Sequence, residues 1–268
     1  MNRTSTAVAL SVDRVTVRFA GVTALDEVSF DIRADAIHAL IGPNGAGKST
    51  LFNVLSAVYR PVSGAVHFCS LDLTRLQPHE VAALGVARTF QNIALLPEAT
   101  VRENLLLGRH HLTRTGFVSS GLRAARSGRE WRLHCERISE IADFVGIADK
   151  LEQPVGALSY GDQKRVEMAR ALCVEPRLLL LDEPAAGMNA NETARMAHLI
   201  RDVRNSLDIP ILLVEHDMGL VMGIADRVTV LDFGRCIADG SPEEVQLDPE
   251  VLRAYLGTEN SARSEIQA

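Results

Sequence analysis

The sequence lacks the features that would mark a membrane-spanning, secreted or disulfide-rich protein. No apolar run approaches the ~18–20 residues that a membrane-spanning helix needs, and the opening MNRTSTAVALSVDRV contains no signal-peptide core. We therefore expect a cytoplasmic protein. The few cysteines are widely separated and form no CxxC pair, which argues against a zinc site and a disulfide framework. We expect all four to be reduced and to lie in or near the core: Cys69, Cys135, Cys173 and Cys236.

An excess of positive charge is also missing. The chain has 28 lysines and arginines against 34 acidic residues, a formal net charge of −6 and a pI near 5.8. Proteins that bind the phosphate backbone of nucleic acid usually carry the opposite balance, so we exclude nucleic acid as the main partner. Aromatic residues make up only 4% of the chain, yet the mean hydropathy is +0.07. This aliphatic composition predicts that partners cover part of the surface.

The remaining composition is that of a folded globular protein. The 268 residues are 47% hydrophobic and 23% charged, and the 19 glycines and 10 prolines are too few for a collagen-like or low-complexity chain. At ~100–200 residues per domain, this length predicts one large domain or two fused subdomains.

Hydrophobic patterning predicts an α/β fold. Apolar and polar residues alternate over 8–19 and 28–32, as in half-exposed antiparallel strands, and a further strand pair is predicted over 66–73. From 97 to 157 the period becomes helical, which indicates an inserted helical subdomain. Short apolar runs separated by amphipathic helices predict a parallel sheet covered on both faces. Its strands are expected at 36–41, 178–181, 211–214 and 228–231, and the helices at 190–206 and from about 217.

A basic stretch lies within the helical insert, from Arg109 to His134. One interpretation is a surface that contacts lipid headgroups or an acidic partner. The alternative is a solvated hairpin tip between two helices. His110 and His111 have no cysteine or carboxylate neighbours at ligand spacing, so we do not expect a metal site there.

A glycine-rich loop follows the predicted strand at 36–41 and precedes a predicted helix. Its sequence fits GxxxxGK[ST] in the strand–loop–helix context that this motif requires. Backbone N–H groups of such a loop converge on phosphate oxygens, and the helix N-terminus adds a positive end. Lys48 would neutralise the β- and γ-phosphates, and Ser49 would offer its hydroxyl to Mg²⁺. The predicted phosphate-binding residues are Gly42, Pro43, Asn44, Gly45, Ala46, Gly47, Lys48, Ser49 and Thr50.

Two adjacent acids follow the apolar run at 178–181. Asp182 and Glu183 stand at the carboxyl end of a predicted parallel strand, where ligands bind in open α/β sheets. We expect Asp182 to hold a magnesium ion through water. Glu183 would point to the other side and act as the general base that polarises an attacking water.

Three further segments carry polar groups suited to phosphate chemistry. Ser159 and Gly161 open an amphipathic helix, and such a turn is a second anion-binding helix N-terminus. His216 follows the strand predicted at 211–214, where it can donate to a γ-phosphate. Gln91 ends the predicted strand at 86–90 and marks the boundary with the helical insert.

In this combination and order, the segments resemble the ATP-binding cassette subunit of ABC transporters. The matching segments are the phosphate loop, a Q-loop at Gln91, LSYGDQ in place of LSGGQ, LLLLDEP, and EHD with its histidine. The resemblance implies a P-loop NTPase (RecA-like) core with an antiparallel β subdomain and an inserted helical subdomain. It implies one domain over 8–257, divided into core and β subdomain at 8–90 and 160–257, a helical subdomain at 91–159, and a flexible tail at 258–268.

The resemblance also implies ATP as the nucleotide and Mg²⁺ as its cofactor. It gives Lys48, Gln91, Glu183 and His216 catalytic roles, adds Gln91 to the metal ligands Ser49 and Asp182, and places Phe19 against adenine. Taken alone, Phe19 would be a core strand residue. A second cassette would complete each site with its Ser159–Gly161 turn, so hydrolysis implies dimerisation, and loss of the γ-phosphate separates the halves.

Longer stretches, among them LDEPAAGMN and VLRAYLG, look like the subgroup that serves branched-chain (hydrophobic) amino-acid uptake. The implied partners are a second cassette, often a different subunit, an integral membrane permease at the inner face of the cell membrane and, indirectly, an extracytoplasmic solute-binding protein. A urea, amide or other small-solute importer stays an alternative. A non-transport ABC ATPase fits less well, because the chain has no long coiled-coil insertion. A GTPase also fits less well, because the chain has no NKxD segment.

Two positions depart from the general cassette pattern. Asp162 stands where LSGGQ has glutamine, and it either faces the nucleotide or points to solvent. Asn189 replaces an aspartate that many cassettes carry, which fits the amino-acid subgroup. The apolar segment at 92–97 is predicted to be a docking site for the permease or, alternatively, to pack within the insert.

Overall fold

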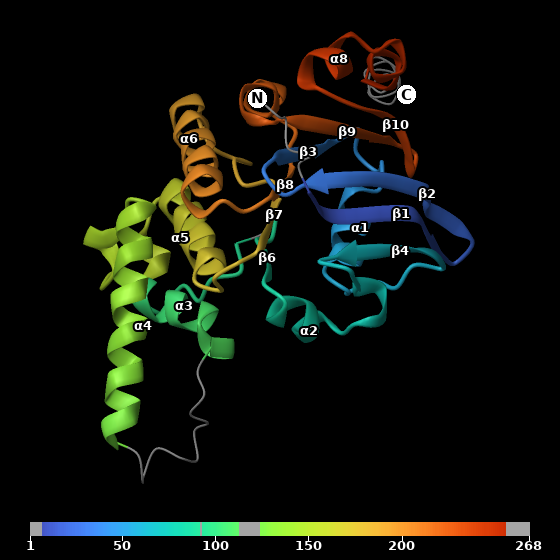
Figure 1. The fold of residues 1–268 in the computed structure, drawn as a ribbon. Helices are drawn as coiled ribbons and strands as arrows, with labels where there is room; N and C mark the ends of the chain where they lie inside the picture. The colour runs from blue at the N-terminus through green and yellow to red at the C-terminus, as the bar shows by residue number, and fades with distance from the viewer. Residues whose placement is uncertain (1–6, 92, 113–123, 256–268) are drawn as a thin grey trace, which may run out of the picture.

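The computed structural model describes residues 7–91, 93–112 and 124–255, which form two sheets and a group of helices (Figure 1). The larger sheet has the order β10-β9-β3-β8-β7-β6, and its neighbours are parallel except for the antiparallel β9–β10 pair. Its strands are β3 (Ile37–Ile41), β6 (Val86–Arg88), β7 (Leu178–Asp182), β8 (Ile211–Val214), β9 (Arg227–Asp232) and β10 (Arg235–Gly240). The predicted α/β class is confirmed.

Helices cover both faces of this sheet, so its central strands are buried throughout. Alternate residues of β7 enter different cores: Leu179 and Leu181 pack in one with α6, and Leu178 and Leu180 in the other with α1. The helices against the sheet include α1 (Lys48–Leu55), α6 (Ala190–Leu207) and α7 (Met218–Ile224). Because β3, β7 and β8 are parallel, the loops that follow them lie at one edge of the sheet.

The second sheet is antiparallel, with the order β2-β1-β4-β5. Its strands are β1 (Val8–Phe19), β2 (Val22–Arg33), β4 (Ser63–Phe68) and β5 (Leu71–Asp72). The strand predicted at 28–32 begins earlier, at Val22, directly after a tight turn in which Ala20 and Gly21 both have positive φ. Register shifts between β1 and β2 interrupt the strict alternation, which is why the pattern missed this first half.

The helical subdomain lies apart from the antiparallel sheet (Figure 1). Its main helices are α3 (Val101–Gly108) and α4 (Ala124–Phe144), and α5 (Tyr160–Leu172), which the predicted boundary assigns to the core, packs against both. Thr100 caps α3, since its hydroxyl accepts the Glu103 N–H and the Glu103 carboxylate accepts the Thr100 N–H. The buried Asn104 side chain bonds both the N–H and the carbonyl of Leu96, which fixes the segment entering the subdomain.

Some elements and environments differ from those predicted. The pattern missed α2 (Pro78–Ala83), β10 and α8 (Pro242–Leu247). Cys69 is exposed and not part of a core, because it lies at the turn after β4. No helix in the described ranges is long and apolar enough to span a membrane.

The two ends of the basic stretch are buried, which corrects both interpretations of it at those positions. Arg109 donates to His134 Nδ1 at 2.8 Å, to the Cys173 carbonyl at 3.2 Å and to Glu175 at 3.0 Å. These contacts attach the ends of the stretch to the C-terminal end of α5. Residues 113–123 of the stretch, and the tail predicted from 258, lie outside the described residues.

Candidate nucleotide-binding site

The glycine-rich loop connects β3 to α1 and requires glycine at both of its ends. At Gly42, with φ of 150°, a Cβ atom would lie 2.0 Å from the Leu231 carbonyl oxygen of β9. At Gly47, with φ of 103°, it would lie 2.7 Å from the Ala24 carbonyl. Larger residues would push the loop off the neighbouring strands, so these glycines set its shape.

Lys48, the first residue of α1, is curled beneath this loop. Its Nζ donates to the carbonyls of Gly42 at 2.6 Å and Pro43 at 2.9 Å. Burial lowers the pKa of Lys48, while the carboxylates of Glu183 and Asp182 act in the opposite direction. The ammonium group is therefore held where a phosphate bound in the loop would meet it.

A cavity of about 280 Å³ opens at the loop and collects most of the predicted residues. It is lined by Ala24, Asn44, Gly45, Ala46, Gly47, Lys48, Ser49, Thr50, Gln91, Glu183 and His216. Ala24 comes from β2. Gln91, Glu183 and His216 follow β6, β7 and β8, and the parallel arrangement of these strands brings them to one edge of the sheet. The predicted site residues that do not line it are Phe19, Gly42, Pro43, Ser159, Gly161 and Asp182.

Glu183 is the centre of the polar contacts in this cavity. Gln91 Nε2 donates to Glu183 Oε2 at 3.0 Å, and His216 Nε2 lies 2.5 Å from Oε1. Glu183 has a φ of 49°, a left-handed conformation that is strained for a residue with a side chain. Its N–H donates to the Val214 carbonyl of β8 at 2.9 Å, which holds it in this conformation. The arrangement presents one carboxylate, fixed from both sides, to the cavity.

The two predicted acids do take different positions. Asp182 is buried behind the cavity, and its Oδ2 accepts from Arg88 Nη2 at 3.0 Å. Arg88 also donates to Asn53 and Ser56 of α1 and its C-cap. Sequence reasoning missed Arg88, because nothing in the pattern shows that β6 pairs with β7.

The donor set suits a magnesium ion. Ser49 offers a hydroxyl and Gln91 an amide oxygen at the cavity, and the Asp182 carboxylate lies behind it. Oxygen ligands of these kinds are those that Mg²⁺ prefers. The residues present therefore fit the ion that the sequence predicted.

Phe19 is 43% exposed at the end of β1, so it is not a core residue. Its ring meets that of Tyr59 edge to face, with centroids 5.1 Å apart. Tyr59 was not predicted as a site residue. Two exposed aromatic rings held side by side offer a surface on which a flat base can stack.

The Ser159 turn forms a separate cavity of about 230 Å³ at the start of α5. Ser159 is the N-cap, and its Oγ accepts the Asp162 N–H at 3.2 Å. Gly161 and Asp162 line the same cavity, together with Lys150 and Arg165. This chain's own serine turn thus does not reach its own phosphate loop.

Two further polar residues support the loops around the cavity. Glu215 is buried and accepts from the N–H groups of Ala185 at 2.7 Å and His216 at 3.1 Å. Burial raises the pKa of Glu215, and these hydrogen bonds act against that rise. Asn189 is the N-cap of α6, where its Oδ1 accepts the N–H groups of Asn191 and Glu192. Glu215 and Asn189 thereby fix the segment that follows the acidic pair, and Glu215 also holds the backbone at His216.

A buried ion pair on α5 holds the backbone next to Gln91. The side chains of Lys164 and Glu167 are 1% and 3% exposed and lie 3.5 Å apart. Lys164 Nζ donates to the Gln91 carbonyl at 3.2 Å, and Glu167 Oε1 accepts the Phe90 N–H at 3.2 Å. One turn further on, Arg170 donates to the Ala94 carbonyl at 2.6 Å. Helix α5 is thus bonded to the backbone on both sides of residue 92.

Removing one member of this pair is expected to destabilise the protein strongly. Lys164→Met or Glu167→Leu alone should lower the free energy of unfolding by about 3–5 kcal/mol, because each leaves a buried charge without its partner. The double variant should lose much less than the sum. Chemical denaturation of the three variants measures this, and additive losses would contradict the pairing.

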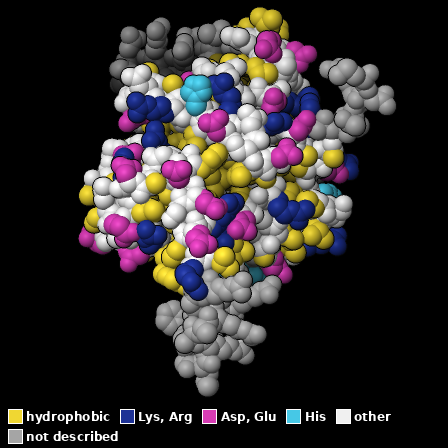
Figure 2. Space-filling view, turned by 60° about the vertical axis from the view of Figure 1, so that its left-hand side comes forward, with side chains coloured by type: hydrophobic (Ala, Val, Ile, Leu, Met, Phe, Trp, Pro, Cys, Tyr) yellow, Lys and Arg dark blue, Asp and Glu magenta, His cyan; other side chains and the backbone are white. Residues whose placement is uncertain are grey.

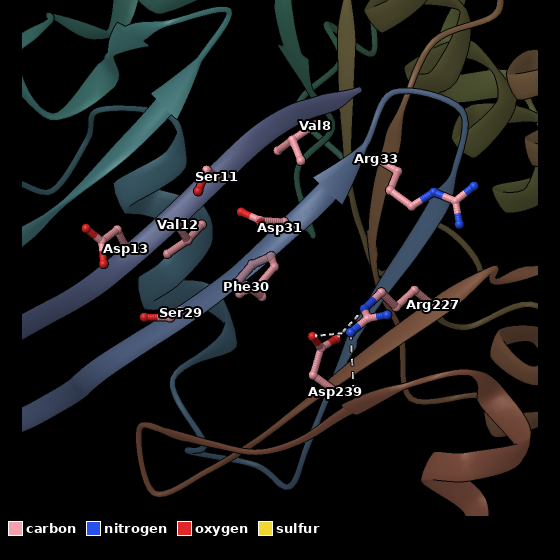
Figure 3. A pocket seen from close by; sticks show the side chains of 10 residues that line it. All are labelled: Val8, Ser11, Val12, Asp13, Ser29, Phe30, Asp31, Arg33, Arg227 and Asp239. Carbon is pink, nitrogen blue, oxygen red and sulfur yellow. Dashed lines mark hydrogen bonds and ion pairs between the residues drawn. The ribbon is translucent and has the colours of Figure 1, made fainter. Parts of the chain in front are cut away.

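A further polar cavity, of about 560 Å³, lies between the exposed side of β1 and β2 and the β9–β10 hairpin (Figure 3). Arg227 of β9 lines this cavity, and its guanidinium is already paired with both carboxylate oxygens of Asp239, at 2.9 and 2.8 Å. None of the predicted site residues lines this cavity. The nucleotide chemistry is therefore assigned to the cavity at the phosphate loop.

Comparison with known proteins identifies the family. The family model described as ABC transporter matches residues 25–186, more than half of the chain. The chain belongs to the ABC transporter family of ATPase cassettes. The solved structure of the ADP conformation of MJ1267, an ATP-binding cassette of an ABC transporter, is similar with a TM-score of 0.82. It is 30% identical, and the match covers 94% of this chain and 100% of that one.

Curated relatives point to one subgroup. The high-affinity branched-chain amino acid transport ATP-binding protein LivG of Salmonella typhimurium is 42% identical over 92% of this chain and 97% of its own length. The corresponding protein BraF of Pseudomonas aeruginosa is 39% identical with the same coverage. A second family model, described as Branched-chain amino acid ATP-binding cassette transporter, matches residues 235–260. The resemblance seen in the sequence is confirmed.

Proposed function

We propose that this chain is the ATP-hydrolysing subunit of an importer for branched-chain amino acids. The observation that carries the catalytic part is the convergence of Gln91 and His216 on the Glu183 carboxylate at the mouth of the phosphate-loop cavity. The match of residues 235–260 to the branched-chain model and the identity to LivG and BraF support the solute class.

In this proposal, ATP binds with its phosphates in the loop at 42–49. The backbone N–H groups and the Lys48 ammonium neutralise the phosphate oxygens, so the net charge of −6 does not oppose binding. Phe19, beside Tyr59, packs on the adenine. When bound, Mg²⁺ would be held by Ser49, Gln91 and Asp182 and would supply further positive charge to the phosphates.

Glu183 is the general base in this proposal. Its carboxylate accepts a proton from the water that attacks the γ-phosphate, and the fixed contacts with Gln91 and His216 orient it. His216 and Gln91 are also placed to contact the γ-phosphate directly. Loss of that phosphate would change the contacts of both residues.

A second cassette is required because the serine turn opens into its own cavity, apart from the phosphate loop. The Ser159 and Gly161 turn of that cassette would complete this chain's site, and the turn of this chain would complete the other. ATP then joins the two cassettes, and hydrolysis separates them.

The permease is proposed to dock beside the Q-loop, which places the chain at the inner face of the cell membrane. Leu96 is 53% exposed there. An apolar cavity of about 280 Å³ lies nearby, lined by Val58 after α1, by Pro78, Val81 and Ala82 of α2, and by Phe90. On the face in Figure 2, hydrophobic side chains are interspersed with charges of both signs. A permease docked there would cover part of this apolar surface, which fits the slightly positive mean hydropathy of +0.07.

The solute class is tested with the permease, the second cassette and the binding protein encoded beside this chain. The methionine import ATP-binding protein MetN of Rhizobium etli is also 36% identical over 90% of this chain and 63% of its own length, so identity over the core does not by itself select the solute. In the reconstituted importer, binding protein loaded with leucine, isoleucine or valine is expected to stimulate ATP hydrolysis. Stimulation by urea-loaded binding protein alone would contradict the assignment and support the urea or amide alternative.

A further inference from the structure

The start of α5 carries a negative charge where the resembling motif has an uncharged amide. Asp162 lies three residues after Ser159 and lines the same cavity. Under the proposed function this cavity faces the triphosphate of a second cassette. Like charges repel each other more strongly near a protein surface than in bulk water, so an uncompensated carboxylate here would oppose ATP.

The structure compensates this carboxylate chiefly with Lys150, while Arg165 Nη1 lies farther off, 3.9 Å from Asp162 Oδ1. Asp162 Oδ2 accepts from Lys150 Nζ at 2.6 Å and from Ser159 Oγ at 2.8 Å. The Lys150 and Asp162 side chains are 24% and 18% exposed, so water screens the pair less than it would at the open surface. Partial burial acts to raise the pKa of Asp162, but the hydrogen bonds from Lys150 and Ser159 outweigh it and the pKa lies below its usual value.

Lys150 is delivered to this place by a fixed turn. It ends the 3₁₀ turn Ala148–Lys150, and its N–H donates to the Ile147 carbonyl at 3.0 Å. The next residue, Leu151, is buried, and its carbonyl accepts the Arg102 N–H of α3 at 2.9 Å. The backbone on both sides of Lys150 is therefore anchored to the helical subdomain.

Lysine is rare in this chain, and each lysine has a specific contact. Of the 28 lysines and arginines, only three are lysines. Lys48 bonds the phosphate loop, Lys164 bonds the Gln91 carbonyl, and Lys150 bonds Asp162. Arginine is the usual surface cation of this protein, so Lys150 does not belong to a lysine-rich surface.

We propose that Lys150 is a positioning residue for the Ser159 turn, which it makes compatible with the phosphates of a second cassette. The Ser159 hydroxyl has one proton, and in this structure it donates that proton to Asp162. To donate to a phosphate, it must leave Asp162. Lys150 binds the same carboxylate oxygen, so it keeps Asp162 in place and neutralised when the hydroxyl turns away. This inference rests on the proposed function, since it needs a second cassette.

The test is a double-mutant cycle in a Glu183→Gln background, which retains bound ATP. Lys150→Met, Asp162→Gln and the combination are compared by the ATP concentration that gives half-maximal dimerisation, measured by light scattering. Lys150→Met is expected to raise that concentration about tenfold when Asp162 is present and to leave it unchanged when residue 162 is glutamine. Lys150→Arg, which keeps the charge, should stay within about threefold of the parent.

Two outcomes would overturn the inference. One is an unchanged ATP requirement in Lys150→Met. The other is an equal effect of Lys150→Met in both backgrounds, which would make Lys150 a general attractant of ATP that acts independently of Asp162. Binding of a fluorescent ATP analogue to the chain's own phosphate loop should be unchanged in all variants, which shows that they are folded. If the Glu183→Gln parent forms no ATP-dependent dimer, alone or with the second cassette of the same importer, the proposed function itself fails.

Discussion

Replacing Glu183 with glutamine is expected to lower the rate of ATP hydrolysis by roughly 10²–10⁴-fold, since general-base catalysis contributes about that much. The amide is nearly isosteric and keeps one oxygen for the contact with Gln91 or His216, but it cannot accept the proton of the attacking water. Release of inorganic phosphate measures the rate. ATP binding should remain, because the substitution removes no contact between the phosphate loop and the nucleotide.

The matched control is Glu152→Gln. Glu152 is an exposed acid that pairs with Arg102 and does not line the phosphate-loop cavity. This variant should hydrolyse ATP at the parental rate. If Glu183→Gln did the same, Glu183 would not be the base, and the contacts of Gln91 and His216 with it would need another explanation.

Replacing Lys48 with methionine is expected to weaken ATP binding about 100-fold. A hydrogen bond to a charged group contributes about 1.5–3 kcal/mol, and Lys48 is held beneath the loop where two phosphates would share its charge. Isothermal titration with ATP measures the dissociation constant. Arg253→Met, an exposed cation paired with Glu250, is the control and should bind as the parent does.

The same substitution separates a role in binding from a role in folding. Lys48 also satisfies the carbonyls of Gly42 and Pro43, so its loss should lower the free energy of unfolding by about 1–3 kcal/mol. A variant that remains folded in thermal denaturation but binds ATP as tightly as the parent would contradict the role of Lys48 at the phosphates.

The central sheet was predictable because each of its buried strands carries its own signal, a short apolar run, in the local sequence. The segments that form β3, β7 and β8 are short, apolar except for His38 and the terminal Asp182, and bounded by turns, and the structure buries every one of their residues. Strand β10 was missed because it forms the antiparallel edge of the sheet and is only partly buried, so it has no continuous apolar run. Helices α2 and α8 have six residues each, too few to show a helical period.

The site was predictable where a motif fixes both residue type and spacing, as in the phosphate loop. Its supporting contacts were not, because they join residues distant in sequence. Arg88 reaches Asp182 across 94 positions, and Lys164 reaches Gln91 across 73. The sequence leaves open whether Asp162 faces the nucleotide or solvent; in the structure it lines the cavity at the Ser159 turn, and its carboxylate accepts from Lys150. Such pairs depend on the tertiary fold, which places α5 against the Q-loop and the turn after α4.

The requirement for a second cassette is tested most directly by the molecular mass of the Glu183→Gln variant. Sedimentation equilibrium is performed with ATP and with ADP, on the isolated chain and on its mixture with the second cassette of the same importer. With ATP, the mass of two cassettes is expected, because in the proposed site the γ-phosphate would bridge a phosphate loop and a partner's serine turn. With ADP, single cassettes are expected. Single cassettes in saturating ATP, in both samples, would contradict the two-cassette site.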